Sequence, residues 1–198
     1  QRSQAAEQQA LVQAQESLDN EFRNIEQLAV RLEGVIKGNQ NTLEDFKSRY
    51  ESVCSYDKPL QLYQNCLTDH INPARDAVAD HEAKRLDVFN KAKADYQAAK
   101  DRIGSGHFSE IGIASDYLDS LRDLESLTSD CSRKLSDGIQ KFEDNLKEHD
   151  RGEQLRLAKE AEERRSQEVQ RAISRGGSVG TASDYQFQSS GPDRSRWL

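Results

Sequence analysis

The chain has 198 residues, of which 32% are charged and only 34% are hydrophobic, and its formal net charge is −7. This composition excludes a thick globular core, but it suits long helices that each bury a narrow apolar seam. The acidic balance argues against nucleic acid or an anionic membrane surface as the main partner. No stretch of the sequence approaches the ~20 apolar residues of a membrane-spanning helix.

From Leu18 to Val53, apolar residues recur at alternating steps of three and four, with a gap between Ile36 and Leu43. A period of 3.5 is typical of a long helix that packs along other helices. We therefore predict a first helix over about residues 4–54, in which a Gln- and Ala-rich start favours helix. The predicted seam consists of Leu11, Leu18, Phe22, Ile25, Ala29, Leu32, Ile36, Leu43, Phe46, Tyr50 and Val53.

Asn39 occupies the gap between Ile36 and Leu43, and it does so in phase. One interpretation is a break after Gly38, with Thr42 and Asp45 starting a new helix as a capping box. The other is a continuous helix in which a buried Asn39 fixes the register between helices. Phase favours the second interpretation, because a loop has no reason to hold Ile36 and Leu43 one heptad apart. We expect Asn39 to be buried and hydrogen-bonded across helices.

Residues 55–71 are expected to form the first connection, because Pro59 is unsuited to a helix interior. Cys54 and Cys66 flank this connection. A disulfide between them would close the loop and contribute roughly 2–3 kcal/mol. The alternative is a pair of ordinary thiols in a reducing compartment. The hypothesis adopted is a Cys54–Cys66 disulfide.

A second helix is predicted over residues 73–103, with Asn72 as its N-cap and Pro73 at its first position. Ala92 and Ala99 in its seam would let a partner helix approach closely. Gly104-Ser105-Gly106 ends it, and Ile111 and Ile113 are available to cover the end of the bundle. A third helix is predicted over residues 114–149, with seam positions Tyr117, Leu121, Leu124, Thr128, Cys131, Leu135, Ile139, Phe142 and Leu146.

The character of the sequence changes after residue 149. Asp150-Arg151-Gly152 is a turn or a weak point, and residues 151–175 are predicted to form a charged helix with a poor apolar stripe. Residues 176–198 are rich in Ser, Gly and Gln, which predicts a disordered tail. Tyr185, Phe187 and Trp197 are its expected anchors on a partner protein.

Sequence motifs that carry chemistry are missing: there is no phosphate-binding glycine loop, nucleophile elbow, zinc-finger spacing or calcium loop. His81 is flanked by Asp80 and Glu82, but it points about 100° away from Asp80 on a helix. We interpret its surroundings as a solvated acidic face. Cys131 lies in an apolar seam, which favours a buried free thiol over a nucleophile. No catalytic residue, cofactor or metal ligand is therefore predicted.

The sequence as a whole predicts an all-α fold. We expect an elongated, antiparallel, coiled-coil-like three-helix bundle over residues 1–150, followed by the charged helix and the tail. The expected function is non-enzymatic: a structural or adaptor protein that binds other proteins and associates with itself. The alternative is an extracytoplasmic ligand-sensing or receptor domain, which a pocket between the helices would favour. A membrane-shaping dimer is disfavoured by the acidic charge, and an enzyme is the last choice.

The chain begins at Gln1 and contains no methionine. We therefore expect it to be part of a longer translation product, whose preceding segment is a signal peptide, a membrane anchor or another domain. With the predicted disulfide, this favours an extracytoplasmic location over the cytoplasm.

Overall fold

The structure is a computed structural model that describes residues 2–52, 58–109, 111–113 and 115–176. Nearly all of these residues are helical, and none of them forms a strand. The chain divides into two compact units, Gln1–Glu148 and His149–Leu198. The predicted all-α class is therefore correct. Tyr185, Phe187 and Trp197 lie outside the described residues.

Helix α1, Arg2–Tyr50, is continuous through residues 38–41, as the phase of its seam predicts. Thr42 does not start a new helix. Its hydroxyl donates instead to the carbonyl of Gly38, one turn back, at 2.9 Å. The predicted seam residues within α1 are buried or half-buried, and Leu28 is an additional buried member. The helix ends earlier than expected, and Val53 lies outside the described residues.

The first connection differs from the prediction, because much of it is helical. Helix α2, Lys58–Cys66, holds Pro59 at its second position, and a π-helical turn, η1, follows over Leu67–Ile71. A proline is tolerated in the first turn of a helix, where its missing N–H has no partner to lose. Buried Tyr63, Cys66 and Ile71 hold this segment against the core.

The predicted N-cap at Asn72 is wrong. Asn72 has α-helical dihedral angles, and its backbone N–H donates to the carbonyl of Leu67, five residues earlier. Helix α3, Asn72–Gly104, thus follows η1 without an intervening loop. A π turn inserts one extra residue into the helical ladder, and here it ends two residues before Pro73, which has no N–H to contribute. The Asn-Pro pair therefore sits within one run of helix.

Helix α3 ends at the predicted glycines. Gly106 has a positive φ of 84°. Its N–H donates to the carbonyl of Ile103, and the N–H of His107 donates to that of Arg102, both at 3.0 Å. This pair of bonds is a Schellman motif, which requires the left-handed conformation that glycine adopts without strain. The following loop packs Phe108, Ile111 and Ile113 against a small core cluster of Leu18, Ala99 and Ile103, as expected.

Helix α4 runs unbroken over Asp116–Arg175. Residues 150–152, predicted as a turn or weak point, are helical, and residues 151–175 are the end of α4 instead of a separate helix. A Cβ atom at Gly152 would meet no neighbouring group within 4 Å, so no contact with another segment interrupts the helix there. From residue 149 onward, however, nearly every described side chain is exposed.

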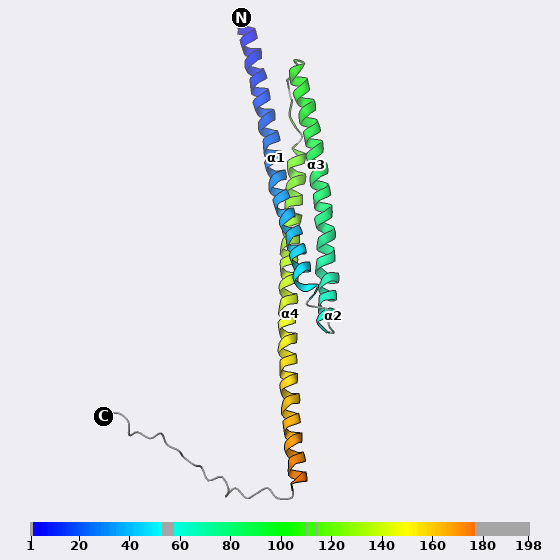
Figure 1. Cartoon of the computed structure of the whole chain (residues 1–198). Coiled ribbons are helices and arrows are strands. Elements are labelled where there is room, and N and C mark those ends of the chain that lie inside the picture. Colours follow the sequence, from blue (N-terminus) through cyan, green and yellow to red (C-terminus); the bar gives the residue numbers. More distant parts are fainter. Residues whose placement is uncertain (1, 53–57, 110, 114, 177–198) are drawn as a thin grey trace, which may run out of the picture. The chain divides into compact units, whose positions relative to one another are not determined.

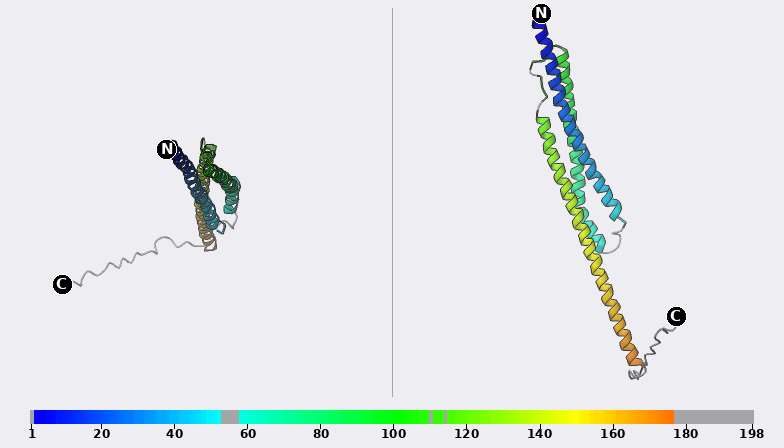
Figure 2. Two further views of the ribbon diagram at one scale, coloured as in Figure 1. Left: turned by 90° about the horizontal axis from the view of Figure 1, so that it is seen from above. Right: turned by 90° about the vertical axis from the view of Figure 1, so that its left-hand side faces the viewer.

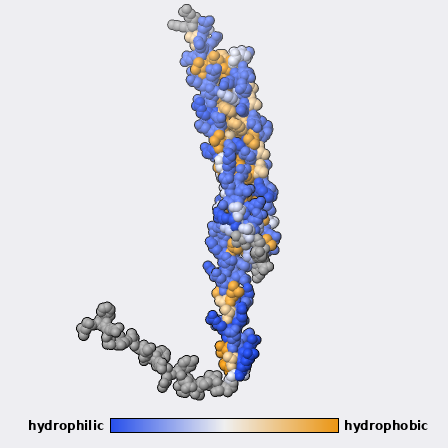
Figure 3. All heavy atoms as spheres, in the orientation of Figure 1, coloured by the Kyte–Doolittle hydropathy of each residue, from blue (hydrophilic) through white to orange (hydrophobic). Residues whose placement is uncertain are grey.

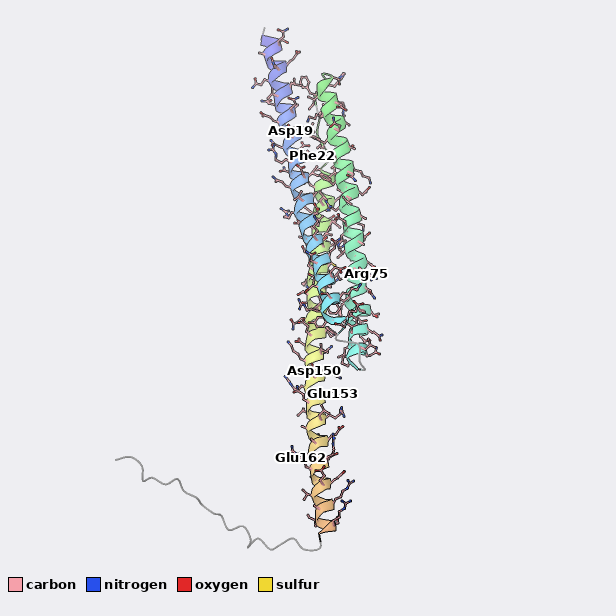
Figure 4. The ribbon with its side chains drawn as sticks, viewed as in Figure 1. Asp19, Phe22, Arg75, Asp150, Glu153 and Glu162 are labelled. Atoms are coloured by element: carbon pink, nitrogen blue, oxygen red, sulfur yellow. The ribbon has the colours of Figure 1, made fainter. Side chains whose placement is uncertain are left out.

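Within the first unit, α1, α3 and the beginning of α4 lie side by side (Figure 1 and Figure 2). Its main core cluster contains residues from all three helices and from the α2–η1 segment. Ala92 and Ala99 are fully buried, as expected for close helix approach. Phe22 of α1 stacks on Tyr96 of α3 at 4.3 Å between ring centroids, and Asp19 accepts a hydrogen bond from the same tyrosine (Figure 4). Most of the surface in view in Figure 3 is hydrophilic.

Candidate functional site

A polar layer crosses the apolar core of the first unit and joins its three long helices. Asn39 comes from α1, His81 from α3, and Thr128 and Ser132 from α4. Asn39, His81 and Thr128 are all buried, at no more than 7% exposure. Buried polar groups are costly unless they are hydrogen-bonded, so the bonds within this layer decide whether it is tolerated.

Asn39 bonds to α4 through both ends of its amide. The Ser132 hydroxyl donates to Asn39 Oδ1 at 2.6 Å, and Asn39 Nδ2 donates to the Thr128 carbonyl at 3.4 Å. The expected burial and cross-helix hydrogen bonding of Asn39 are therefore observed. Its role in fixing register stays a prediction.

His81 completes the layer from α3. The Thr128 hydroxyl donates its single hydrogen to the carbonyl of Leu124 at 2.7 Å. Its contact with His81 Nδ1, at 3.2 Å, then requires that nitrogen to carry the proton and donate. Burial lowers the pKa of His81, more than the neighbouring Asp80 raises it. The neutral imidazole is thus the form that fits the layer.

Arg85 lies one turn after His81 on α3 and is also buried, with a side chain only 8% exposed. It forms two hydrogen bonds with Glu82, at 2.8 and 2.6 Å, and its guanidinium lies 3.9 Å from Glu33 of α1. The hydrogen bonds with Glu82 are the largest influence that raises the pKa of Arg85. A buried charge with this pairing is satisfied and links α3 to α1.

The sequence prediction missed the burial of His81 and Arg85. The surroundings of His81 were interpreted as a solvated acidic face, which is wrong for His81 itself, and no prediction was made for Arg85. The signal was present in the phase of α3, because Ala74, Val78, His81 and Arg85 follow one another at steps of four, three and four. Heptad phase therefore outweighed local charge at these positions.

A groove lies beside the polar layer, between α3 with η1 on one side and α4 on the other. Its volume is about 590 Å³. Pro73, Ala74, Ala77 and Leu127 give it apolar walls, and His81 connects it to the polar layer. Further lining residues are Asp69, His70, Asp130, Cys131, Lys134, Asp137, Gly138 and Lys141.

Gly138 permits a very close approach of α4 to η1 at the end of this groove. A Cβ atom there would lie 2.5 Å from Cγ and 2.7 Å from Cβ of His70. The Cys66 thiol lies 3.9 Å from the Gly138 carbonyl, to which it donates a weak hydrogen bond. The π turn and α4 thus meet at a position that only glycine fits.

Cys66 and Cys131 are both free and buried thiols, and Cys54 lies outside the described residues. The predicted Cys54–Cys66 disulfide is therefore not found, whereas the free thiol predicted at Cys131 is observed. Burial raises the pKa of Cys66 to about 11 and also raises that of Cys131. A buried, protonated thiol is a poor nucleophile, so neither cysteine marks a reactive site.

Comparison with known proteins gives no relative. No protein-family model matches the chain, and no curated protein or solved structure is similar to it.

The described residues contain no group of three or more His, Cys, Asp or Glu side chains placed to hold a metal ion. No helix in the described ranges combines the length and apolarity needed to cross a bilayer.

The hydroxyls and the amide of the polar layer are hydrogen-bonded to one another and to the backbone within the core. Such an arrangement suits a role in positioning the helices.

Proposed function

We propose that this protein is a non-enzymatic structural or adaptor protein, built on an antiparallel, coiled-coil-like three-helix bundle that mediates protein–protein assembly. Contacts between the helices support the bundle. Asp19 of α1 contacts Tyr96 of α3, and further along α1 Glu33 contacts Arg85, which comes earlier in α3. These contacts support an antiparallel pairing of α1 and α3. Arg31 of α1 pairs with Glu125 of α4, and Tyr50 pairs with Glu143. Residue numbers therefore increase in the same direction along α1 and α4, as in two parallel helices.

The observation that carries the assembly function is the exposed end of α4. From residue 149 to Arg175 it is helical, yet Leu155, Leu157, Val169 and Ile173 are each at least half exposed. Short isolated helices are marginal in water, and most helical stability comes from packing of an apolar face. A helix of this kind is best explained by a partner that covers it.

A site-specific photocrosslinker tests this function. A benzophenone amino acid at Val169, one of these exposed apolar positions, should give a discrete adduct in an extract of the source cells. The matched control is the same group at Gln167, which lies about 200° away around the helix. An adduct with another protein or with a second copy of the chain supports an assembly role. Equal adducts from both positions, or none from either, contradict it.

The C-terminal segment beyond residue 176 is proposed to contribute to this binding through Tyr185, Phe187 and Trp197. The core clusters of the first unit are formed by residues between Leu11 and Leu146. Truncation after Gly176 should therefore leave the melting temperature of the first unit nearly unchanged and weaken the crosslinked adduct. A large fall in melting temperature would contradict this division of roles.

A second candidate function is ligand sensing, and the groove between α3 and α4 favours it. Its volume of about 590 Å³ lies within the range of small-molecule pockets, and its walls combine apolar and polar groups. A small-molecule set should then contain compounds that raise the melting temperature of the native chain and not of Ala77→Phe, which fills the groove. If no compound discriminates between the two proteins, the sensing function is wrong. An extracytoplasmic location of the chain belongs to this second candidate function and is proposed with it.

A further inference from the structure

The exposed end of α4 contains a regular seam that its poor overall apolarity obscures. Every residue of this seam is exposed. Steps of three, four, three, four and three separate its members, so they share one face of the helix with a heptad period. The seam residues are Leu155, Ala158, Glu162, Arg165, Val169 and Ala172.

The charged centre of this seam is unpartnered within the described residues. Arg156 pairs with Glu153 and Glu160, and Arg164 approaches Glu160 at 3.9 Å. By contrast, neither Glu162 nor Arg165 has a hydrogen bond or ion pair in that part of the chain. Glu162 is labelled in Figure 4, and Figure 3 shows hydrophobic patches on this segment separated by hydrophilic surface. The seam thus leaves one acid and one base, one turn apart, facing outward.

The seam is complementary to itself when it is read in the opposite direction. Facing residues are then Leu155 with Ala172, Ala158 with Val169, and Glu162 with Arg165. Each large apolar residue meets a small one, and each acid meets a base. A parallel pairing would instead place Glu162 against Glu162 and Arg165 against Arg165, which is repulsive.

We propose that residues 149–175 pair with the same segment of a second copy of this chain, as an antiparallel two-helix coiled coil centred between Glu162 and Arg165. The proposal rests on the assembly function above and names its partner. Twofold symmetry gives the dimer two identical Glu162–Arg165 pairs at its centre. A polar central layer weakens the pairing but selects its direction and register.

Sedimentation equilibrium of the full chain tests the proposal. The native chain should dimerise at concentrations below about 0.5 mM. Glu162→Arg creates two Arg–Arg contacts and should raise the dimer Kd at least about tenfold. The double variant Glu162→Arg/Arg165→Glu restores two opposite-charge pairs and should return the Kd to within about threefold of the native value.

Glu163→Arg is the matched control, because it makes the same charge change about 100° away around the helix. It should leave the dimer Kd nearly unchanged. Circular dichroism shows whether the first unit of each variant is folded, which separates loss of pairing from loss of structure.

A chain that stays monomeric throughout overturns the proposal, as does a double variant no better than Glu162→Arg. Equal weakening by Glu162→Arg and Glu163→Arg also overturns it, because the seam would then have no special role. These failures leave the assembly function standing if the Val169 crosslinker still gives a discrete adduct with another protein. Failure of the assembly function itself would remove both the adduct and the dimer.

Discussion

The hydroxyl of Ser132 on α4 donates a 2.6 Å hydrogen bond to Oδ1 of Asn39 on α1, inside the core of the first unit. It is the shortest link in the polar layer. The Thr128 carbonyl lies 3.0 Å from the same hydroxyl and offers it a second acceptor. If Asn39 is replaced, the Ser132 hydroxyl can still donate to the Thr128 carbonyl, so the replacement leaves no unsatisfied donor on Ser132.

Asn39→Leu should raise the free energy of unfolding by about 1 kcal/mol, because an apolar residue extends the seam and leaves no orphaned partner. The same change should loosen register, seen as broadened amide signals of α1 and α4. Urea denaturation measures the first effect and NMR the second. Asn39→Ala is the control, which leaves a void and should destabilise. A large loss of stability in Asn39→Leu would show that the layer stabilises the fold outright.

Gly138→Ala should destabilise the first unit by about 1–3 kcal/mol. The new methyl group would overlap the Cβ of His70, which belongs to the first part of that side chain and cannot swing away. This cost exceeds the ~1 kcal/mol that alanine gains over glycine in a helix.

Gly34→Ala is the matched control, since no atom lies within 4 Å of a Cβ there. It should stabilise the protein by about 0.5–1 kcal/mol. Chemical denaturation of both variants compares the two glycines directly. A neutral or stabilising Gly138→Ala would contradict the close approach of η1 and α4.

Stability should fall as the pH is lowered below about 6.5, the usual pKa of histidine. Burial lowers the pKa of His81 in the folded chain, so over this range the unfolded chain takes up a proton that the folded chain does not. The stabilising contribution is therefore present above the unfolded pKa and is lost on acidification. His81→Gln should flatten the dependence of unfolding free energy on pH between 7.5 and ~5.5. An unchanged slope would contradict burial of a neutral imidazole.

Cys66 should react slowly with iodoacetamide in the folded protein at pH 8, because burial raises its pKa to about 11 and little thiolate forms. Above the unfolded pKa of cysteine, the unfolded chain loses this proton first, so alkaline conditions should also weaken the fold. In denaturant without reductant, Cys66 and Cys131 should both alkylate fully. Mass spectrometry of peptides reports this. Protection of Cys66 under those conditions would support a disulfide to Cys54 after all.

The long helices could be predicted because their apolar residues recur along the sequence with a regular period. Continuity of α1 through Asn39 and the end of α3 at Gly106 both follow from residues close in sequence. The π turn could not be predicted, because Asn72-Pro73 is an equally good start for a new helix. The contact of Arg85 with Glu33 joins residues fifty-two positions apart, and close approach at Gly138 depends on His70. Such pairings appear only when the helices are side by side.

The polar layer also has a consequence for how the chain reaches its native state. Because the seams repeat every seven residues, α1 can pair with α4 about 10 Å too high or too low and still bury apolar side chains. In either misaligned pairing Leu121 or Leu135 stands in the place of Thr128, and Asn39 loses the hydrogen bond from the Ser132 hydroxyl. We therefore expect misaligned pairings to be less stable than the native one, so that the layer helps to select the native alignment during folding.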